Sequence, residues 1–534
     1  MKNKSLFAAI DLGSNSFRLE IGQLEAGHLR RVEYIKETVR QGNGLDAERN
    51  LSQDAMQRGW DCLARFAERI AGFQPSQVRA VATQTMREAH NREVFLSKAK
   101  DILGFPIEVI TGREEARLIY LGVSHLLPQS TERRLVVDIG GRSTELILGQ
   151  NAQAQTLESY RVGSVGWSMK YFADGQWTNS AFKAAEIAAK AILDEAQMQY
   201  PRQSWDTCYG SSGTVGAVAD VLALAGWPEG LITRDGLDWL KDKLLKAQKA
   251  EYLKIEGVKD DRRPVIGGGL AVLRAVFDLL DIDEMRAAQG ALRHGALFDL
   301  LDRENPNDDV RSQMVIWLTQ RFGSDRLQAE RVSRTAQAIL RNMLHKTSDD
   351  TDTARHLRKI HWAAQLHEVG MHISHSDYHK HGAYILDNTD LPGFTIDELH
   401  RLSQLVLGHR GKLRKLDAPL QDPLFVQQLM ALRMSVILCH ARRDPDTKGM
   451  LLRLDGHIYW GADCINRLAL LSSDSDLFNQ FNAAIFRRPC LSAALYPFMT
   501  RGRALTGSMS TWQARPKIAC IIVTVITCCG GPWS

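Results

Sequence analysis

Short apolar runs followed by polar turns open the chain, and one such unit occurs twice. Residues 11–22 are DLGSNSFRLEIG and residues 138–149 are DIGGRSTELILG, so both match D-[LI]-G-x-x-S-x-x-L-x-[IL]-G. Each copy follows an apolar run, at residues 6–10 and 135–137. Glycine accepts the backbone angles of a tight turn, while leucine and β-branched residues favour strands. Each copy therefore predicts a strand, a polar turn and a second strand, and the repeat predicts two related half-domains.

Beyond the first copy, the apolar residues alternate between strand-like and helix-like spacing. Residues 53–72 place Met56, Trp60, Leu63 and Ile70 at near-helical spacing, which predicts a helix. The same reasoning predicts strands at 78–82 and 107–111 and helices at 113–125, 180–199 and 236–253. Strands and helices that alternate around both copies of the repeat indicate two α/β domains.

The pattern changes at the polar segment ENPNDD, residues 304–309, which we interpret as a linker. From there to about residue 440 it is almost wholly helical. From about residue 486 the helical periodicity is lost, and the chain ends in a β-prone apolar run that we interpret as a non-native tail, such as one from a shifted reading frame. We expect a first α/β domain at 1–130, a second at 131–304, a helical domain at 305–480 and the atypical tail at 486–534.

Composition and charge exclude several classes of protein. Apolar residues make up 44% and charged residues 24% of the 534 positions, as in ordinary soluble globular proteins. The net charge of +5 is small for this length and does not indicate a nucleic-acid binder. The eight cysteines show no CxxC or zinc spacing, which favours a reduced, cytoplasmic protein. We find no signal peptide and no apolar run of about 18 residues or more, and so expect no transmembrane segment.

The two repeated turns point to a binding chemistry. A tight turn of this kind directs backbone N–H groups and small hydroxyls to one spot, which suits an anion such as phosphate. Asp11 leads one turn and Asp138 the other. Two such turns predict two half-domains that close on a phosphate and a metal ion.

Six segments resemble one known family. They are AAIDLGSNSFR (8–18), VATQTMREAHN (81–91), ITGREEARLIYLGV (110–123), VVDIGGRSTEL (136–146), YGSSGTVGAV (209–218) and QGALRHGAL (289–297). In these motifs the chain resembles the Ppx/GppA family of exopolyphosphatases and guanosine pentaphosphate phosphohydrolases over roughly residues 5–470. The resemblance implies an α/β fold with two RNase H-like domains of the actin/Hsp70/sugar-kinase superfamily, followed by an all-α HD-like C-terminal domain.

The resemblance also implies the catalytic residues. Glu115, the second Glu of the EEA motif, matches the carboxylate that activates water, whereas Glu114 is expected to stay a first-turn residue of a helix. Asp138 and Glu145 match catalytic acidic positions, and their oxygen atoms suit Mg²⁺. Asp11 is a weaker third candidate for the metal. From sequence alone each of these acids also has a local interpretation, as a turn or helix-start residue.

Phosphate binding is expected at both turns and at two arginines. Arg18 occupies the same repeat position as Glu145, so the two halves would supply opposite charges to one site, and Arg87 resembles a family arginine of the cleft. For Lys36 and Arg40 the sequence favours neither of two roles, a phosphate ligand or a solvated surface residue. Arg142 stands where the family has a third glycine, and it could add a positive charge near the substrate. The turn residues expected to bind phosphate are Gly13, Ser14, Asn15 and Ser16 in one loop and Gly140, Gly141, Ser143 and Thr144 in the other.

Two further regions keep two interpretations each. The segment 210–214 (GSSGT) resembles the superfamily's third glycine-rich motif, but close packing of a strand-to-helix turn explains it equally well. In the helical region His367 is followed by Glu368 instead of the Asp of a working HD site. We expect a degenerate HD site there, with metal binding by His375, His379 and His381 as the alternative. The histidines of this region are His361, His367, His372, His375, His379, His381, His400 and His409.

The sequence leads to one main functional prediction and three alternatives. The main prediction is an exopolyphosphatase that uses Mg²⁺ to release orthophosphate from the end of inorganic polyphosphate. The alternative within the family is a phosphohydrolase that converts guanosine-5'-triphosphate,3'-diphosphate (pppGpp) to ppGpp. A kinase of the same superfamily and a non-catalytic binding protein lie outside this class. We expect a homodimer in the cytoplasm, with peripheral attachment to the inner membrane left open.

Overall fold

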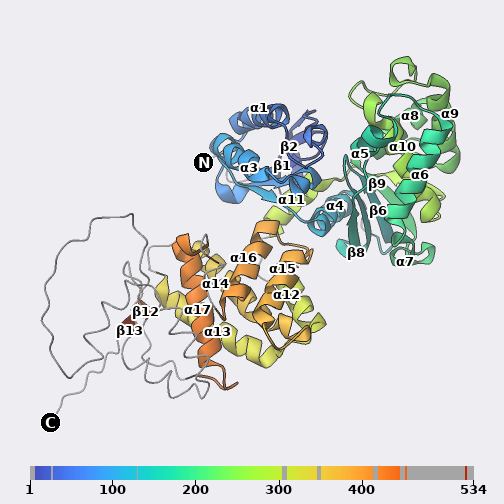
Figure 1. Cartoon of the computed structure of the whole chain (residues 1–534). Coiled ribbons are helices and arrows are strands. Elements are labelled where there is room, and N and C mark those ends of the chain that lie inside the picture. Colours follow the sequence, from blue (N-terminus) through green and yellow to red (C-terminus); the bar gives the residue numbers. More distant parts are fainter. Residues whose placement is uncertain are drawn as a thin grey trace, which may run out of the picture. The chain divides into compact units, whose positions relative to one another are not determined.

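The structure is a computed structural model of the chain, which Figure 1 shows as a ribbon. It describes residues 6–25, 28–128, 130–302, 310–344, 350–411, 413, 416, 419–445, 452–453 and 524–525. The predicted linker at 304–309 and, apart from the short strand β13 (Thr524–Val525), the predicted tail at 486–534 lie outside these residues. None of the described helices is long and apolar enough to cross a membrane.

The first repeat forms the centre of a five-stranded sheet. Its strands lie in the order β3-β2-β1-β4-β5. β2 pairs antiparallel with β1 and β3, whereas β4 pairs parallel with β1 and β5. The bounds are β1 Leu6–Leu12, β2 Phe17–Glu25, β3 His28–Glu37, β4 Val78–Ala82 and β5 Ile107–Val109. The predicted turn between β1 and β2 is confirmed, as is the strand at 78–82, while the strand predicted at 107–111 ends two residues earlier.

The second repeat forms the centre of a six-stranded sheet with the order β10-β11-β9-β6-β7-β8. The run β8-β7-β6-β9-β11 repeats the order and the strand directions of the whole first sheet. The sequence duplication is therefore a duplication of sheet topology. The bounds are β6 Arg133–Ile139, β7 Thr144–Gln150, β8 Gln153–Tyr160, β9 Thr207–Ser211, β10 Leu231–Thr233 and β11 Glu284–Ala287.

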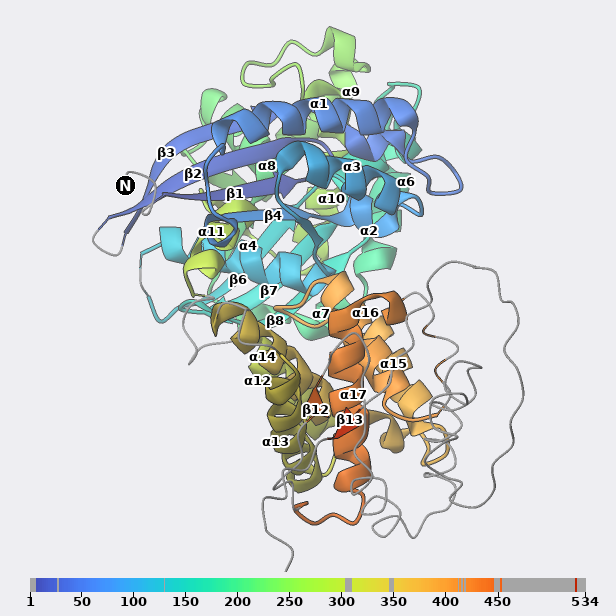
Figure 2. The ribbon, with the colours of Figure 1, turned by 90° about the vertical axis from the view of Figure 1, so that its left-hand side faces the viewer.

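Amphipathic helices bury one face of each sheet. Figure 2 shows α1 lying along the first sheet, where Met56, Trp60, Leu63 and Ile70 enter the core together with strand residues, as their spacing predicts. The helices of the first half are α1 Gln53–Arg69, α2 Gln84–Glu88, α3 Arg92–Leu103 and α4 Gly112–Leu126. Those of the second half are α5 Ser164–Tyr171, α6 Asn179–Leu193, α7 Ala196–Gln199, α8 Ser212–Leu224, α9 Arg234–Ala247, α10 Ile266–Leu279 and α11 Leu292–Asp302.

Two of these helices link the halves. α4, which follows the first sheet in sequence, packs on β7 and β8 of the second sheet, and α11, which follows the second sheet, packs on β1 of the first. α4 and α11 also pack on each other. The sequence division near residue 130 therefore falls inside one interlocked unit.

The described residues divide into two compact units. The first contains the residues up to Arg311 together with Asp390–Asp397, and the second contains Ser312–Thr389 and the residues from Glu398 onward. The second unit is helical, and α13, α14 and α17 pack on one another in it (Figure 2). Its helices are α12 Val310–Arg321, α13 Arg326–Met343, α14 Asp350–Leu366, α15 Tyr378–Asn388, α16 Ile396–Gly408 and α17 Pro423–Leu438, and a short strand, β12 Leu452–Arg453, pairs with β13.

Candidate active site

The strand register places the two repeated acidic positions in equivalent environments. Asp11 on β1 pairs with Arg18 on β2, and Asp138 on β6 pairs with Glu145 on β7. Residues directly opposite on antiparallel strands project to the same face of the sheet. Asp11 and Arg18 accordingly form an ion pair with an Oδ2–Nη1 distance of 2.7 Å, whereas the second copy places two carboxylates together.

The two turns border one cavity of about 320 Å³. Eleven of the residues predicted from the sequence line it, from both copies of the repeat and from the first turn of α4. The predicted lining residues are Asp11, Gly13, Ser14, Asn15, Ser16, Arg18, Glu115, Asp138, Gly140, Gly141 and Ser143. The fold thus brings the two turns and the predicted base to one place.

Three predicted residues, all within the described chain, do not line this cavity. Thr144 is buried, and its hydroxyl donates to the Val162 carbonyl at 2.6 Å, so it fixes a loop instead of contacting a ligand. Glu145 is buried, and its carboxylate accepts a hydrogen bond from the Ser159 hydroxyl at 2.7 Å. Arg87 does not line the cavity but bonds Glu115, which does.

Glu115 is a buried carboxylate held by Arg87. The Arg87 Nη1 donates to Glu115 Oε2 at 2.8 Å and to the Ile110 carbonyl at 3.0 Å. Burial raises the pKa of Glu115 to about 7, because it outweighs the effect of Arg87, and the negative charges of Asp11 and Asp138 add to the rise. A carboxyl with a pKa near neutral suits a general base.

The Arg87 side chain has one unused donor. Its Nε donates to the Gln84 side chain at 2.9 Å, but its buried Nη2 has no hydrogen-bond partner in the structure. A buried donor without a partner costs free energy. An anionic oxygen bound at this point would satisfy it.

The acidic pair of the second copy fits a divalent cation. Burial raises the pKa of Asp138 to about 6, and burial together with the charges of Glu115 and Asp138 raises the pKa of Glu145 well above its usual value. Such carboxylates favour a positive partner. No group of three or more metal-ligating side chains gathers among the described residues, and Asp11 is engaged by Arg18. The pair Asp138 and Glu145 matches Mg²⁺, which uses one or two carboxylates and takes its other ligands from water and substrate phosphates.

Several basic residues line the cavity without having been predicted as ligands. They are Lys259, Arg262 and Arg293. Of the two basic residues whose role the sequence left undecided, Lys36 lines the cavity and Arg40 does not. Lys36 bonds Asp261 at 3.0 Å and so connects the first half to the second. Arg293 stands in the QGALRHGAL motif, which was the available signal, while Lys259 and Arg262 lie in a polar loop with no periodic pattern.

Arg293 is held from behind by a buried carboxylate. Its Nε donates to Glu20 Oε2 at 2.5 Å, and its guanidinium lies over the Tyr34 ring, 4.8 Å from the centroid. His294 and Arg31 contact the other oxygen of Glu20. Although burial alone would raise the pKa of Glu20, the hydrogen bond from His294 and the charges around it lower the pKa to about 2. Glu20 is therefore ionised and holds Arg293 in one orientation.

The segment 210–214 lies at the cavity wall. Ser212, Gly213 and Thr214 line it. A Cβ on Gly213 would lie 2.0 Å from Nη2 of Arg262, so glycine lets that guanidinium lie directly on the turn. Gly210 packs instead against Met285 and Val215. A Cβ on Gly210 would lie 2.5 Å from the Met285 sulfur and 2.5 Å from Cγ1 of Val215. Close packing thus explains Gly210, while Gly213 lines the cavity, and the resemblance to the superfamily's glycine-rich motif stays a prediction.

The sequence suggested that Arg142 lies near the substrate, but in the structure its side chain bonds Glu88. Its Nε and Nη2 donate to Glu88 Oε2 at 3.0 and 2.8 Å, and its Nη1 donates to the Gly42 carbonyl at 3.2 Å. It does not line the cavity. Arg142 therefore ties the second turn to the first half, because Glu88 and Gly42 belong to that half.

In the helical unit, three histidines come together in the interior. The His409 ring lies 5.5 Å from His367 and 6.2 Å from His379, measured between centroids. The Nδ1 atoms of His367 and His409 each bond a carbonyl of their own helix region, Ala364 and Val406, at 2.6 Å. As in the first unit, no three-ligand metal group is found among the described residues. The HD-like fold and a metal at these histidines stay predictions.

Solved structures with the same fold match a little more than half of the chain. An exopolyphosphatase-like protein is 27% identical with a TM-score of 0.50, and the match covers 55% of this chain and 97% of that protein. An exopolyphosphatase from Cytophaga hutchinsonii is 22% identical with a TM-score of 0.50, covering 56% and 98%. The fold is that of the actin-like ATPases, here with a helical C-terminal region.

Curated relatives match most of the chain. The guanosine-5'-triphosphate,3'-diphosphate pyrophosphatase of Photobacterium profundum is 40% identical over 441 residues, which are 82% of this chain and 87% of that protein. The protein of the same name from Vibrio atlanticus is 40% identical over 442 residues, covering 82% and 88%. Residues 21–304 match the model of the Ppx/GppA phosphatase family and residues 310–461 that of its domain III. This chain therefore belongs to the Ppx/GppA phosphatase family.

Proposed function

We propose that this protein hydrolyses the terminal phosphoanhydride of pppGpp to give ppGpp and orthophosphate. The observation behind the proposal is the buried Glu115 at a cavity bordered by both repeated turns and by a group of basic side chains. Polyphosphate stood first among the sequence-based predictions. The relatives at 40% identity are named for pppGpp, and they favour the alternative.

In the proposed reaction, Glu115 accepts a proton from the attacking water. Its pKa near 7 lets it be ionised at neutral pH and still bind the proton well. Arg87 fixes the carboxylate at 2.8 Å, and its buried Nη2 has no hydrogen-bond partner of its own. Proton removal makes the water a stronger nucleophile as the bond to the terminal phosphorus forms.

The two turns and Arg18 would hold the phosphate oxygens. The small residues Gly13, Ser14 and Gly141 allow close approach of a phosphate to the backbone, and Arg18 is oriented by Asp11. Not every amide is available, because the Gly140 N–H donates to the Ser143 carbonyl at 2.9 Å. Mg²⁺, when bound by Asp138 and Glu145, would neutralise charge on the transferring phosphoryl group.

The remaining basic residues would bind the rest of the substrate. Arg18 and Arg262 lie close enough to Lys36 for their charges to lower its pKa, and burial followed by the charge of Arg18 lowers the pKa of Arg262. Positive charges gathered in a cavity favour an anion of several charges. pppGpp has a second, 3' phosphate group that meets this requirement.

Polyphosphate is the second candidate, since a site that binds only phosphates accepts both. The solved relative that is 27% identical is named exopolyphosphatase-like.

The family resemblance also leads us to propose a homodimer, and a monomer in sedimentation at working concentration would refute it.

Phosphate release with Mg²⁺ from pppGpp and from long-chain polyphosphate, measured side by side, tests the proposal. We expect the higher kcat/KM with pppGpp. Glu115→Gln should lower kcat by roughly 100- to 10,000-fold, while Glu93→Gln, a matched change of an exposed first-turn carboxylate on α3, should leave it unchanged. Turnover of polyphosphate alone would select the second candidate. Turnover of neither would favour a kinase or a binding protein.

A further inference from the structure

The helix that carries Glu115 begins at a turn with an unusual cap. The first N–H groups of a helix have no partner within it. In α4 the Thr111 hydroxyl accepts the Glu114 N–H at 3.2 Å and the Thr111 carbonyl accepts the Glu115 N–H at 3.0 Å. The Arg113 N–H donates to the Asp390 carboxylate at 3.1 Å. The cap of this helix is thus completed by a residue 277 positions away.

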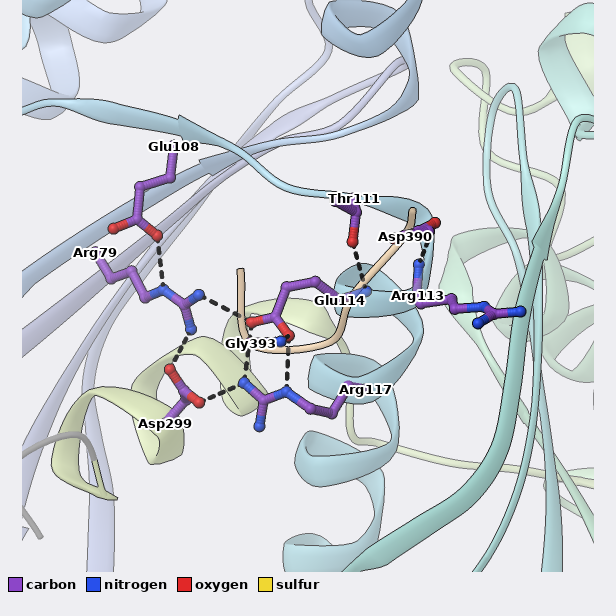
Figure 3. Close-up of polar contacts among 9 residues, drawn as sticks. All are labelled: Arg79, Glu108, Thr111, Arg113, Glu114, Arg117, Asp299, Asp390 and Gly393. Carbon is purple, nitrogen blue, oxygen red and sulfur yellow. Dashed lines mark hydrogen bonds and ion pairs between the residues drawn. The ribbon is translucent and has the colours of Figure 1, made fainter. Parts of the chain in front are cut away.

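The neighbouring Glu114 joins a buried ionic cluster (Figure 3). Its side chain is fully buried and accepts hydrogen bonds from Arg79 at 3.1 Å and from Arg117 at 2.7 and 2.9 Å. It also accepts the Gly393 N–H at 2.6 Å. Asp299 on α11 bonds both arginines. Glu114 therefore lies in a site that is fully occupied by protein groups and faces away from the cavity.

The segment 390–397 supplies both of these contacts. It follows α15 and includes the first two residues of α16, but it packs with the first unit. Leu391 and Phe394 are buried, and Thr395 forms an antiparallel bridge with Ile110, two residues before α4. The segment is thereby fastened on both sides of the helix start.

Gly393 is the one position in the segment where the backbone itself demands glycine. Its φ of +86° is in the left-handed region. A Cβ there would also lie 2.8 Å from Cγ of Arg311. The tight turn presents the Gly393 N–H to Glu114, and a larger residue would displace it.

We propose that segment 390–397 is a positioning element of the active site, in which Asp390 and Gly393 fix the first turn of α4 and so hold Glu115 toward the cavity. The inference rests on the proposed role of Glu115 as the base. Glu114 and Glu115 are adjacent on the helix, so a shift of Glu114 in its cluster moves Glu115 with it. A displacement of about 1 Å at a catalytic group can cost roughly a hundredfold in rate.

The test uses the full chain with Mg²⁺ and pppGpp, or polyphosphate if only that is turned over. Asp390→Ala removes the cap, and we expect kcat to fall roughly tenfold or more with little change in KM. Asp390→Asn keeps an acceptor oxygen and should restore most of the rate. Asp422→Ala is the control, because the Asp422 carboxylate also accepts a first-turn N–H of a helix, that of Leu424 in α17 of the helical unit. It should leave kcat unchanged.

A double-mutant cycle separates positioning from a general loss of folded protein. In the Glu115→Gln background, Asp390→Ala should lower the residual rate by less than twofold, because there is no longer a base to position. An equal loss in both backgrounds, or no loss in the wild-type background, would overturn the inference. Should Glu115→Gln itself keep the wild-type rate, the proposed base is wrong, which is a different outcome from failure of Asp390.

Gly393→Ala gives an independent second variant if Asp390→Ala does not fold. It displaces the segment without removing a charge. We expect the same pattern, a loss of kcat in the wild-type background and none in the Glu115→Gln background. Wild-type kcat in folded Gly393→Ala would contradict the proposal.

Discussion

At the scale of single residues, equivalent positions of the repeat have diverged in charge. The first copy pairs Asp11 with Arg18, so its acid is neutralised within the protein. The second copy pairs Asp138 with Glu145, and burial raises the pKa of both. One half of the duplicated unit thus contributes Arg18 to the cavity, and the other contributes Asp138, with Glu145 opposite it on the next strand.

Arg293 is expected to bind substrate from the orientation that Glu20 imposes. Arg293→Ala should raise KM for pppGpp roughly 10- to 100-fold, the loss of a charged hydrogen bond of about 1.5–3 kcal/mol. Glu20→Gln should give a smaller increase, because Arg293 stays but is less firmly held. Steady-state kinetics checks both, with Arg30→Ala on β3 as an exposed control. An unchanged KM in Arg293→Ala would show that the side chain does not contact the substrate.

Arg142→Gly restores the glycine that the family usually has at this turn. Since Arg142 bonds Glu88 and does not line the cavity, kcat should stay within about twofold. The free energy of unfolding should fall by about 1.5 to 3 kcal/mol, as for a charge-assisted hydrogen bond between half-buried groups. Urea unfolding of Arg142→Gly, Glu88→Gln and the double variant checks this, and the two effects should not add. A tenfold loss of kcat would place Arg142 in the catalytic site.

At the scale of elements, the crossing of α4 and α11 holds the two halves together. The helices approach closely because glycines lie at the contact. A Cβ on Gly295 would be 1.8 Å from the Leu118 carbonyl oxygen, and one on Gly122 would be 2.3 Å from the Ala291 carbonyl oxygen. Backbone atoms cannot move aside as a flexible side chain does, so this crossing tolerates only glycine.

Gly295→Ala should therefore destabilise the first unit strongly. The methyl group would force α4 and α11 apart, at a cost of about 3 kcal/mol or more. Gly166→Ala on α5 is the control, because nothing lies within 4 Å of its Cβ position, and it should change stability by about 1 kcal/mol or less, in the stabilising direction. Urea unfolding followed by circular dichroism measures both. A wild-type midpoint for Gly295→Ala would contradict the close crossing.

The sequence predicted the elements better than their contacts. The repeat and the apolar spacing located both hairpins and α1, because each depends on residues close in sequence. The EEA motif located Glu115. Neither the contact of Asp390 with α4 nor the placement of Arg262 on Gly213 could be predicted, because each joins segments far apart whose residues are individually ordinary turn or surface types. That the Thr144 hydroxyl bonds the Val162 carbonyl could not be predicted either, because a small hydroxyl in a polar turn has the same sequence pattern whether it faces a ligand or a neighbouring carbonyl.

At the scale of the whole molecule, each unit buries a characteristic group of polar side chains, ionised in the first unit and neutral in the helical one. The first unit buries ion pairs, such as Glu114 with Arg79 and Arg117. The helical unit buries a group of three histidines, His367, His379 and His409. Burial lowers the pKa of His367, lowers that of His379 to about 4, and lowers that of His409 well below its usual value. These imidazoles are neutral in the folded unit.

The helical unit should consequently lose stability in mild acid. In the unfolded chain a histidine binds a proton as the pH falls through about 6.5. The folded His379 does so only near pH 4, and the basic residues that face it, Lys380, Arg410 and Arg433, oppose its charging, while Asp377 favours it. Between these pH values the unfolded state binds more protons, so the stability is fully present above about pH 6.5 and declines as the pH is lowered toward 4.

Hydrogen–deuterium exchange of α15 and α16 at pH 7.5 and pH 5, corrected for the intrinsic rate, measures this loss locally. Protection should fall at pH 5 in the wild type. It should fall less in His379→Gln, which removes one of the groups that must charge on unfolding. His400→Gln, a change of an exposed histidine on α16, should keep the wild-type pH dependence. Equal pH dependence in His379→Gln and the wild type would mean that burial of His379 does not link protonation to the stability of this unit.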